Sequence, residues 1–350
     1  MKRLLRKIIE EWIFSISLAG LVGTSLYLKR FPHYSYSDFK VIFTLFVFLV
    51  IVKGLEKNKV LKFLAWKFEK GRLISVKLVL LTAVLSMFMT NDVALITIVP
   101  LTLALNVGDV ELLVILETIV ANGASALTPF GNPQNIFLYY HYNVSPAAFI
   151  MTILPFAVFF TILALLLAFK IKDSSPIQSA KPLPNKEGYI YGIFFVLFVL
   201  AVLHVIPLWI GVVPIIYAFF TNREILNIDY FLLGTFIAFF GFTDNLMHVL
   251  TFSLDSPRNV FFTTAFLSQI MSNVPATLLL ADFTPNWRAL LWGASVGGFG
   301  TLIGSLANLI SYRIYQTHKG QPKRYLIRFH IYSFTAFLLG ILLYLIVCTC

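Results

Sequence analysis

The chain has 350 residues, of which 59% are hydrophobic and only 12% are charged. This composition excludes an ordinary water-soluble domain, in which about 25% of the residues are charged, and indicates a membrane protein with several spans. The formal net charge of +11 does not indicate nucleic-acid binding, because lysine and arginine lie mostly in short loops between apolar runs, where they orient the spans.

The apolar runs predict an all-α polytopic membrane protein. They are continuous, as spanning helices require, and they do not alternate as the strands of a membrane β-barrel would. We expect nine crossings, at residues 11–28, 40–53, 108–142, 146–170, 189–205, 207–221, 229–250, 287–316 and 327–348. We divide the run 189–221 into two crossings at Pro207, and a single crossing of this run is the alternative.

Two further apolar segments, residues 73–105 and 259–284, are too long for one simple span and carry polar residues at their centres. We interpret each as a re-entrant helical hairpin, which enters and leaves the membrane on the same side. Each hairpin precedes a crossing, at 108–142 or 287–316, whose polar centre predicts a broken helix.

Two polar or mixed segments complete the organisation. Residues 56–72 mix lysine with large apolar side chains at helical spacing, which predicts an amphipathic helix on the inner membrane surface. Residues 172–188 form a long polar stretch, which we interpret as a cytoplasmic linker. We therefore expect a first repeat at 1–171 and a second repeat, with one extra span, at 189–350.

The distribution of basic residues predicts the orientation. A cytoplasmic N-terminus places most of the 27 lysine and arginine residues, including Lys2, Arg3, Arg6 and Lys7, on the inner side. The same count places the C-terminus outside. We expect an integral protein of the cell (inner) membrane whose first span is retained and not cleaved as a signal peptide.

The two halves share short sequence matches in the same order. "SMFMTNDVA" at 86–94 aligns with "SQIMSNVPA" at 268–276, and "TPFGNPQNI" at 128–136 aligns with "TLIGSLANL" at 301–309. Combined with the orientation predicted from charge, these matches indicate two inverted repeats, which are typical of secondary transporters.

The interrupted helices predict which kinds of ion bind near the middle of the membrane. Breaks at Thr90-Asn91 and Ser272-Asn273, with Asn132 and Ser305 as N-caps of the second halves of the broken helices, place four helix N-termini near the midplane. Helix N-termini suit an anion, whereas free carbonyl groups and Asn or Thr oxygens suit a small hard cation. Neighbouring anion and cation sites indicate coupled transport.

The hairpin and loop motifs together resemble the ion transporter superfamily, which includes divalent anion:sodium symporters, citrate transporters, arsenite permeases and some sodium/proton antiporters. The resemblance covers most of residues 70–320. It implies a homodimer in which a transport domain moves against a scaffold domain as an elevator. The dicarboxylate branch has Ser-Asn-Thr in its hairpins, whereas Asp92 and Val274 replace that threonine here, so "TND" is more similar to the arsenite-permease and antiporter branches.

From the motifs and this resemblance we expect a substrate and ion site built from both halves. Its members are Thr90, Asn91, Asp92, Asn122, Thr128, Gly131, Asn132, Asn135, Ser272, Asn273, Thr301, Gly304, Ser305 and Asn308. Asp92 either binds a coupling proton or cation, or only stabilises the start of its own helix. Glu117 and Asp244 are ionisable groups in apolar runs and are candidates for a proton or cation relay.

These features predict an ion-coupled secondary active transporter for a small anion or oxyanion. The alternative is a sodium/proton antiporter that uses its intramembrane carboxylates. An enzyme is not expected, because the chain shows no recognisable catalytic constellation. We expect no cofactor and no metal beyond a coupling sodium ion; the partners are the anionic substrate, the coupling cation (sodium ion or proton), the lipid bilayer and a second copy of the chain.

Overall fold

The computed structural model describes residues 12–68, 72–105, 107–172, 181–250, 253–319 and 322–348. Their regular secondary structure consists of α-helices and short 3-10 helices, which confirms the prediction of an all-helical chain. The four N-terminal basic residues and residues 173–180 of the predicted linker at 172–188 lie outside the described residues.

The N-terminal part contains a long helix pair and a short third helix. Its elements are α2 (Trp12–Leu28), α3 (Tyr36–Lys57) and α4 (Val60–Phe68). A capping box begins α3: the Asp38 backbone N–H donates to Ser35 Oγ at 3.2 Å, and the Ser35 N–H donates to Asp38 Oδ2 at 2.7 Å. The cap starts α3 four residues before the predicted crossing at 40–53.

The segment 73–105 forms two helices that pack together, α5 (Ile74–Phe88) and α6 (Asn91–Ala104). Met89 and Thr90 between them have extended backbone, so the helical hydrogen-bond ladder stops at the polar centre of the segment. The predicted broken helix at 108–142 is likewise two helices, α7 (Val110–Ser125) and α8 (Pro133–His141). The first half ends with α9 (Pro146–Ala168).

The run 189–221 forms separate helices and not one long span. Helix α10 (Lys186–Val202) ends just before His204, whose backbone has a positive φ of 62°. The chain continues through η1 (Leu208–Gly211) into α11 (Val212–Thr221), which packs against α3. Pro207 therefore lies in the segment between two helices, as the N-cap of η1, and not inside a helix.

The remaining elements follow a similar order to those of the first half. They are η2 (Arg223–Leu226), α12 (Tyr230–Met247), α13 (Pro257–Met271), α14 (Asn273–Ala281), α15 (Trp287–Gly297), α16 (Leu306–Lys319) and α17 (Pro322–Cys348). Segment 259–284 divides at Ser272, and segment 287–316 divides between Gly297 and Leu306.

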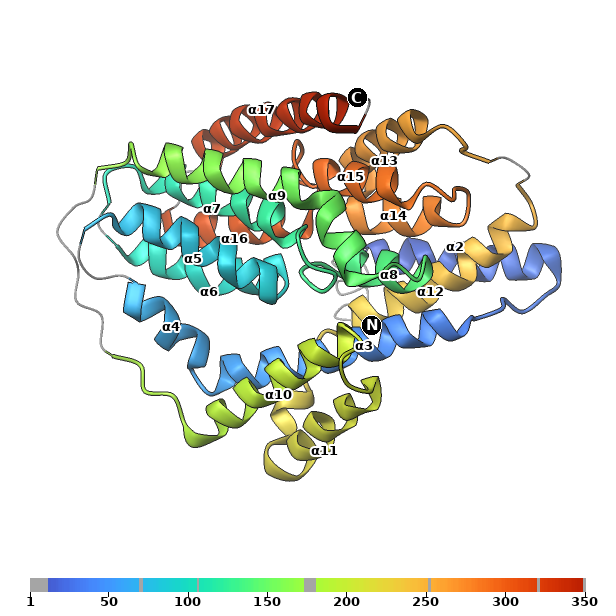
Figure 1. Cartoon of the computed structure of the whole chain (residues 1–350), viewed down its shortest axis with the longest axis horizontal. Coiled ribbons are helices and arrows are strands. Elements are labelled where there is room, and N and C mark those ends of the chain that lie inside the picture. The colour runs from blue at the N-terminus through green and yellow to red at the C-terminus, as the bar shows by residue number, and fades with distance from the viewer. Residues whose placement is uncertain are drawn as a thin grey trace.

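The two halves of the chain pack into one another. Helix α5 packs on α7, and α13 packs on α15, whereas α6 contacts α16 and α8 contacts α14 across the halves. Helices α2 and α12 form a closely packed pair, and α10 packs on α3. Figure 1 shows α17 along one side of the molecule and α10 and α11 along the opposite side.

Three stretches of helix are long and apolar enough to cross a membrane unaided: Pro146–Ala168, Arg223–Met247 and Lys323–Cys348. Most of the side chains in the first and third of these windows are not buried inside the protein, as expected for helices that face lipid. Several other apolar helices, such as α5 and α6, are shorter because polar residues interrupt them.

Candidate functional site

Three buried asparagine side chains form a hydrogen-bonded line through the centre of the molecule. The Asn91 amide nitrogen donates to Asn122 Oδ1 at 3.0 Å, and the Asn122 amide nitrogen donates to Asn308 Oδ1 at 2.8 Å. Asn91 begins α6, Asn122 lies in the last turn of α7, and Asn308 lies in the first turn of α16. This amide line therefore joins a helix break in the first half to a helix break in the second, and fixes how each amide points.

The break between α13 and α14 lies beside the same line. The Asn273 side chain donates to the Ala294 carbonyl at 3.3 Å, and its backbone N–H donates to the Gly304 carbonyl at 3.0 Å. A Cβ atom on Gly298 would lie 3.2 Å from Asn273 Nδ2 and 3.6 Å from Asn122 Oδ1. Gly298 thus lies between the second break and the amide line, in a space that leaves little room for a side chain.

The loops within the two broken helices are tied by the same pair of hydrogen bonds. In each, the amide nitrogen of an asparagine in the following helix donates to the carbonyl oxygens seven and ten residues earlier. The bonds run from Asn135 to Thr128 (2.9 Å) and Ser125 (3.3 Å), and from Asn308 to Thr301 (3.0 Å) and Gly298 (3.0 Å). Residues matched by the sequence alignment therefore make matched contacts.

A second matched bond connects each loop to the preceding hairpin. The Thr128 hydroxyl donates to the Met87 carbonyl, and the Thr301 hydroxyl donates to the Gln269 carbonyl at 3.0 Å. Met87 and Gln269 occupy equivalent positions in the aligned hairpin motifs. The loop containing Gly131 is compact, because a Cβ atom there would lie 2.1 Å from the Ser125 carbonyl oxygen.

Most of the helices that follow the breaks begin with a polar residue whose side chain makes no capping hydrogen bond in the described structure. Thr90, Asn132 and Ser272 occupy N-cap positions, yet no side-chain capping bond is found there in the described chain. Asn132 Oδ1 is buried and has no hydrogen-bond partner among the described residues. Ser305, before α16, accepts a bond from the Ala307 N–H at 3.3 Å. Helix starts of this kind can bind a ligand through backbone N–H groups. Two of these groups are already used, because the Asp92 N–H donates to Asn91 Oδ1 and the Asn273 N–H donates to the Gly304 carbonyl.

Ser272 has an unusual backbone conformation, with φ 76° and ψ 154°. A non-glycine residue rarely adopts this region, and such strain is often found at functional sites. Ser272 is buried, so the surrounding helices hold the break in place.

Asp92 does not join the amide line. Its backbone N–H donates to Asn91 Oδ1 at 3.0 Å, and no hydrogen bond from its carboxyl group to the amide line is found among the described residues. Within the described chain, the buried Asp92 Oδ1 atom has no hydrogen-bond partner. The residue that departs from the dicarboxylate motif therefore lies next to the amide line without being part of it.

Glu117 is completely buried in α7, on a side where α6 packs. Its Oε1 atom accepts a hydrogen bond from the Thr102 hydroxyl at 2.5 Å, and its Oε2 atom has no partner among the residues described. The structure therefore places Glu117 in the protein interior, whereas its role as a relay stays a prediction.

Asp244 lies apart from the central residues. Its Oδ2 atom is 2.7 Å from Arg30 Nη2 and accepts a bond from the His33 N–H at 2.9 Å. With 23% of its side chain exposed, Asp244 is a partly exposed, ion-paired carboxylate. The structure therefore gives no support to Asp244 as a buried relay, because its charge is already balanced by Arg30.

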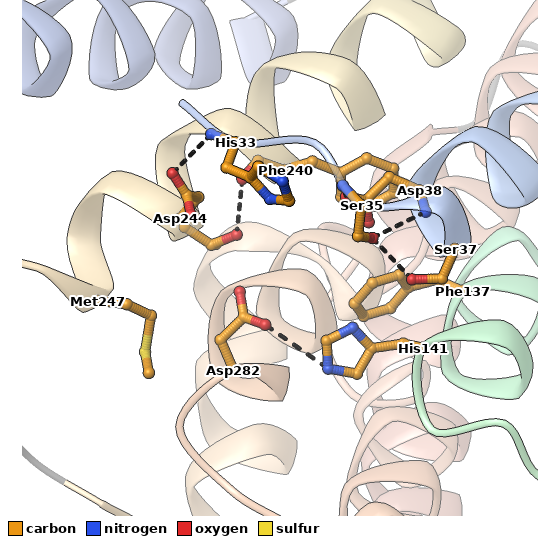
Figure 2. A pocket seen from close by; sticks show the side chains of 11 residues that line it. His33, Ser35, Ser37, Asp38, Phe137, His141, Phe240, Asp244, Met247 and Asp282 are labelled. Atoms are coloured by element: carbon orange, nitrogen blue, oxygen red, sulfur yellow. Dashed lines mark hydrogen bonds and ion pairs between the residues drawn. The ribbon is translucent and has the colours of Figure 1, made fainter. Parts of the chain in front are cut away.

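Asp244 lines a cavity of about 310 Å³, here called the outer pocket because the charge distribution predicts that it lies on the outer side (Figure 2). The other lining residues are His33, Ser35, Ser37, Asp38, Phe137, His141, Phe240, Thr243, Met247 and Asp282. Figure 2 shows His141 and Asp282 facing each other on one side of it, with His141 Nε2 3.6 Å from Asp282 Oδ1. The pocket separates the loop before α3 and the end of α12 from the ends of α8 and α14.

An ionic cluster lies where the chain enters α7. Arg328 of α17 donates to Asp109 Oδ2 at 2.8 Å and to Glu111 Oε1 at 2.9 Å, and the Tyr315 hydroxyl donates to Glu111 Oε2 at 3.1 Å. The hydrogen bond from Arg328 lowers the pKa of Asp109 below its ordinary value. This cluster and the His141–Asp282 pair were not predicted, because their partners lie in separate helices and share no motif.

Comparisons with known proteins place the chain among transporters. The sequence profile of the family described as citrate transporter matches residues 8–292. The uncharacterized transporter MJ0456 of Methanocaldococcus jannaschii is 38% identical over 290 residues, covering 79% of this chain and 81% of that protein. The inner membrane protein YbiR of Escherichia coli K12 is 32% identical over 360 aligned residues, covering 94% and 93%.

A plant transporter matches a shorter part of the chain. The silicon efflux transporter LSI3 of Oryza sativa subsp. japonica is 31% identical over 131 residues, which is 35% of this chain and 27% of that protein. The three relatives and the family profile agree with the resemblance inferred from the hairpin and loop motifs, and confirm that inference.

Proposed function

Because the chain belongs to the citrate transporter family, we propose that this integral inner-membrane protein carries a small anion or oxyanion, coupled to the movement of a sodium ion or a proton. Membership of a transporter family confirms the prediction that the protein is not an enzyme. The observation that carries the proposal is the amide line, which brings helix breaks from both halves of the chain to one buried place.

The anion is proposed to bind at the helix starts beside the amide line. The backbone N–H groups that follow Thr90, Asn132 and Ser272 carry partial positive charge. The side chains of these three N-cap residues accept no capping hydrogen bond from them in the described structure. Buried amide side chains supply both donors and acceptors there. The relative whose name specifies silicon efflux supports including oxyacids among the candidate substrates.

The coupling cation is proposed to bind at the carbonyl ends of the same breaks. Backbone carbonyls and the oxygen atoms of asparagine and threonine are suitable ligands for a small hard cation. The buried Asn132 Oδ1 atom, which has no partner in the described chain, is one such oxygen. This arrangement places anion and cation close together, so that each stabilises the binding of the other.

Two inverted repeats and re-entrant hairpins remain part of this proposal. The matched bonds of Asn135 and Asn308, and those of Thr128 and Thr301, support the repeat. Three ion pairs support the orientation predicted from the basic residues, because each joins two residues that this orientation assigns to the same side of the membrane. The pairs are Arg30 with Asp244 outside, Lys57 with Glu224 inside, and Asp109 with Arg328 inside.

An elevator movement gives the outer pocket a role. We propose that α5–α8 and α13–α16 move as one body against α2, α3 and α10–α12. The outer pocket lies between elements of these two groups, so it would change shape as they slide. The homodimer implied by the resemblance stays a prediction.

Transport by the purified protein in liposomes tests the proposal. Imposed sodium or proton gradients should drive accumulation of at least one labelled compound from a panel of citrate, succinate, sulfate, arsenite and silicic acid. Asn122→Ala should abolish that accumulation, whereas Asn227→Ala, at an exposed position, should not. Absence of accumulation for every compound under both gradients would contradict anion transport.

The buried, unpartnered Asp92 Oδ1 atom favours one second candidate, sodium/proton antiport. In that case the carboxylate would exchange the two cations and no anion would move. A sodium gradient alone should then change the internal pH of the liposomes, and Asp92→Asn should remove this change. Unchanged antiport in Asp92→Asn would exclude Asp92 from the mechanism.

A further inference from the structure

We propose that Glu117 is a proton-binding site of the transport cycle, which takes up one proton from water and releases it again as the protein changes conformation. The inference rests on the coupled transport proposed above and deepens it. It names the proton as a coupling ion and assigns it to a residue outside the amide line.

The geometry around Glu117 suits a neutral carboxyl group. The side chain is 0% exposed, and only one of its two oxygen atoms has a hydrogen-bond partner in the described structure, the hydroxyl of Thr102. A carboxylate needs several donors or a cation to replace its lost hydration, and one hydroxyl is insufficient. A protonated carboxyl group needs much less, because it carries no net charge.

No basic side chain forms an ion pair with Glu117 among the residues described. Of the helices that pack against α7, α9 contains no ionisable residue, α6 contains only Asp92, and α5 contains only Lys77, in its first turn. Helices α16 and α17 also pack against α7 and carry basic residues, including Arg313 and His318 in α16, and Arg324, Arg328 and His330 in α17. Arg324 and Arg328 pair with Glu111 and Asp109, and none of these five forms an ion pair with Glu117 in the described structure. The buried Tyr325 of α17 carries no positive charge. The groups facing Glu117 therefore do not supply a balancing positive charge.

A metal ion fits this place less well than a proton does. Hard cations prefer about six oxygen ligands, whereas the described partner of Glu117 is the single Thr102 oxygen. The described residues also contain no group of three or more His, Cys, Asp or Glu side chains suited to a metal ion. A proton requires only the carboxyl group itself.

Two tyrosines, one of α16 and one of α17, adjoin the ionic cluster on the predicted inner side. The ring of buried Tyr325 stacks on that of Tyr315, with 4.4 Å between the centroids, and the Tyr315 hydroxyl donates to Glu111. Asp109, at the end of this series, has 38% of its side chain exposed. We expect the proton to leave toward this side when the helices around α7 loosen.

Infrared difference spectroscopy of the full-length protein in lipid bilayers tests the protonation directly. At neutral pH the wild type should show the C=O stretch of a protonated carboxyl group, and this band should shift in deuterated water. Glu117→Gln should lose the band. The matched control Glu56→Gln, which removes an exposed carboxylate, should keep it.

Thr102→Val keeps the carboxyl group and removes its hydrogen-bond donor, so the band should move to higher wavenumber. This variant also tests the assignment if Glu117→Gln does not fold. A wild-type spectrum without the band, a Glu117→Gln spectrum that has lost no band relative to the wild type, or a Thr102→Val spectrum in which no band has moved would overturn the proposal.

Transport in liposomes separates this inference from the proposed function. A proton gradient should drive uptake of the transported compound at least tenfold faster in the wild type than in Glu117→Gln. Uptake driven by sodium and equal in both proteins would refute the role of Glu117 while leaving anion transport standing. If no compound of the panel is taken up, the proposed function fails, and the infrared band still decides whether Glu117 binds a proton.

Discussion

The Asn122 side chain donates a hydrogen bond to Asn308 Oδ1 at 2.8 Å, although the two residues are 186 positions apart. Asn308 in turn donates to the carbonyl groups of Gly298 and Thr301. Asn308 therefore both shapes its own loop and joins the two halves of the chain. Its removal should affect structure and transport together.

Asn308→Ala should lower the stability by about 1–2 kcal/mol for each bond whose partner stays buried and unpaired. Thermal unfolding of the detergent-solubilised protein measures this as a lower Tm. Asn135→Ala should have a comparable effect, because Asn135 makes the matched bonds in the other loop. A large loss of Tm in one variant and none in the other would argue against the matched roles.

Gly131→Ala should prevent the loop before α8 from adopting its present shape. The new methyl group would lie 2.1 Å from the Ser125 carbonyl oxygen, so the backbone must move. We expect transport to be lost and the Tm to fall. The control is Gly192→Ala in α10, where no atom lies within 4 Å of the added Cβ, and where alanine favours the helix.

Linking the two walls of the outer pocket should stop transport if the walls move relative to each other. With the native cysteines replaced, Ser37→Cys and His141→Cys lie on opposite groups of helices and line one cavity. Treatment with a bifunctional thiol reagent should inhibit uptake in this double variant. Full activity after confirmed cross-linking would contradict the elevator movement.

The matched control for that experiment lies within one group. Asn245 of α12 donates to the Ser25 hydroxyl of α2 at 2.8 Å, so Ser25→Cys and Asn245→Cys place two thiols on elements that should move together. Cross-linking this pair should leave uptake nearly unchanged. Inhibition equal to that of the pocket pair would mean that cross-linking harms the protein for another reason.

The interaction of Asp109 with Arg328 should depend on pH. Because Arg328 lowers the pKa of Asp109 in the folded protein, the carboxylate contributes stability above its unfolded pKa of about 4 and loses it as pH falls through the lower, folded value. At neutral pH Asp109→Asn should have a lower Tm than the wild type. This difference should narrow on acidification below about pH 4; a constant difference would show that charge is not the cause.

Local chemistry determined much of the fold in advance. Apolar runs of sufficient length indicated helices, and the Asn, Gly, Ser and Pro residues within them indicated where helices end. The breaks beside Thr90 and Ser272, and the start of α8 at Pro133, were therefore predictable from a few neighbouring residues. The motif resemblance was sufficient to identify the family because it depends on the same short segments.

Partners that are distant in the chain were decided only by tertiary structure. The sequence could not show that Asn122 would bond both Asn91 and Asn308, that Asp244 would pair with Arg30, or that His141 would face Asp282. Helical spacing fixes which face a side chain occupies, but packing of helices decides what that face meets. The sequence by itself determined a helical transporter with polar breaks, and only the packing of its two halves placed those breaks together and left Glu117 isolated beside them.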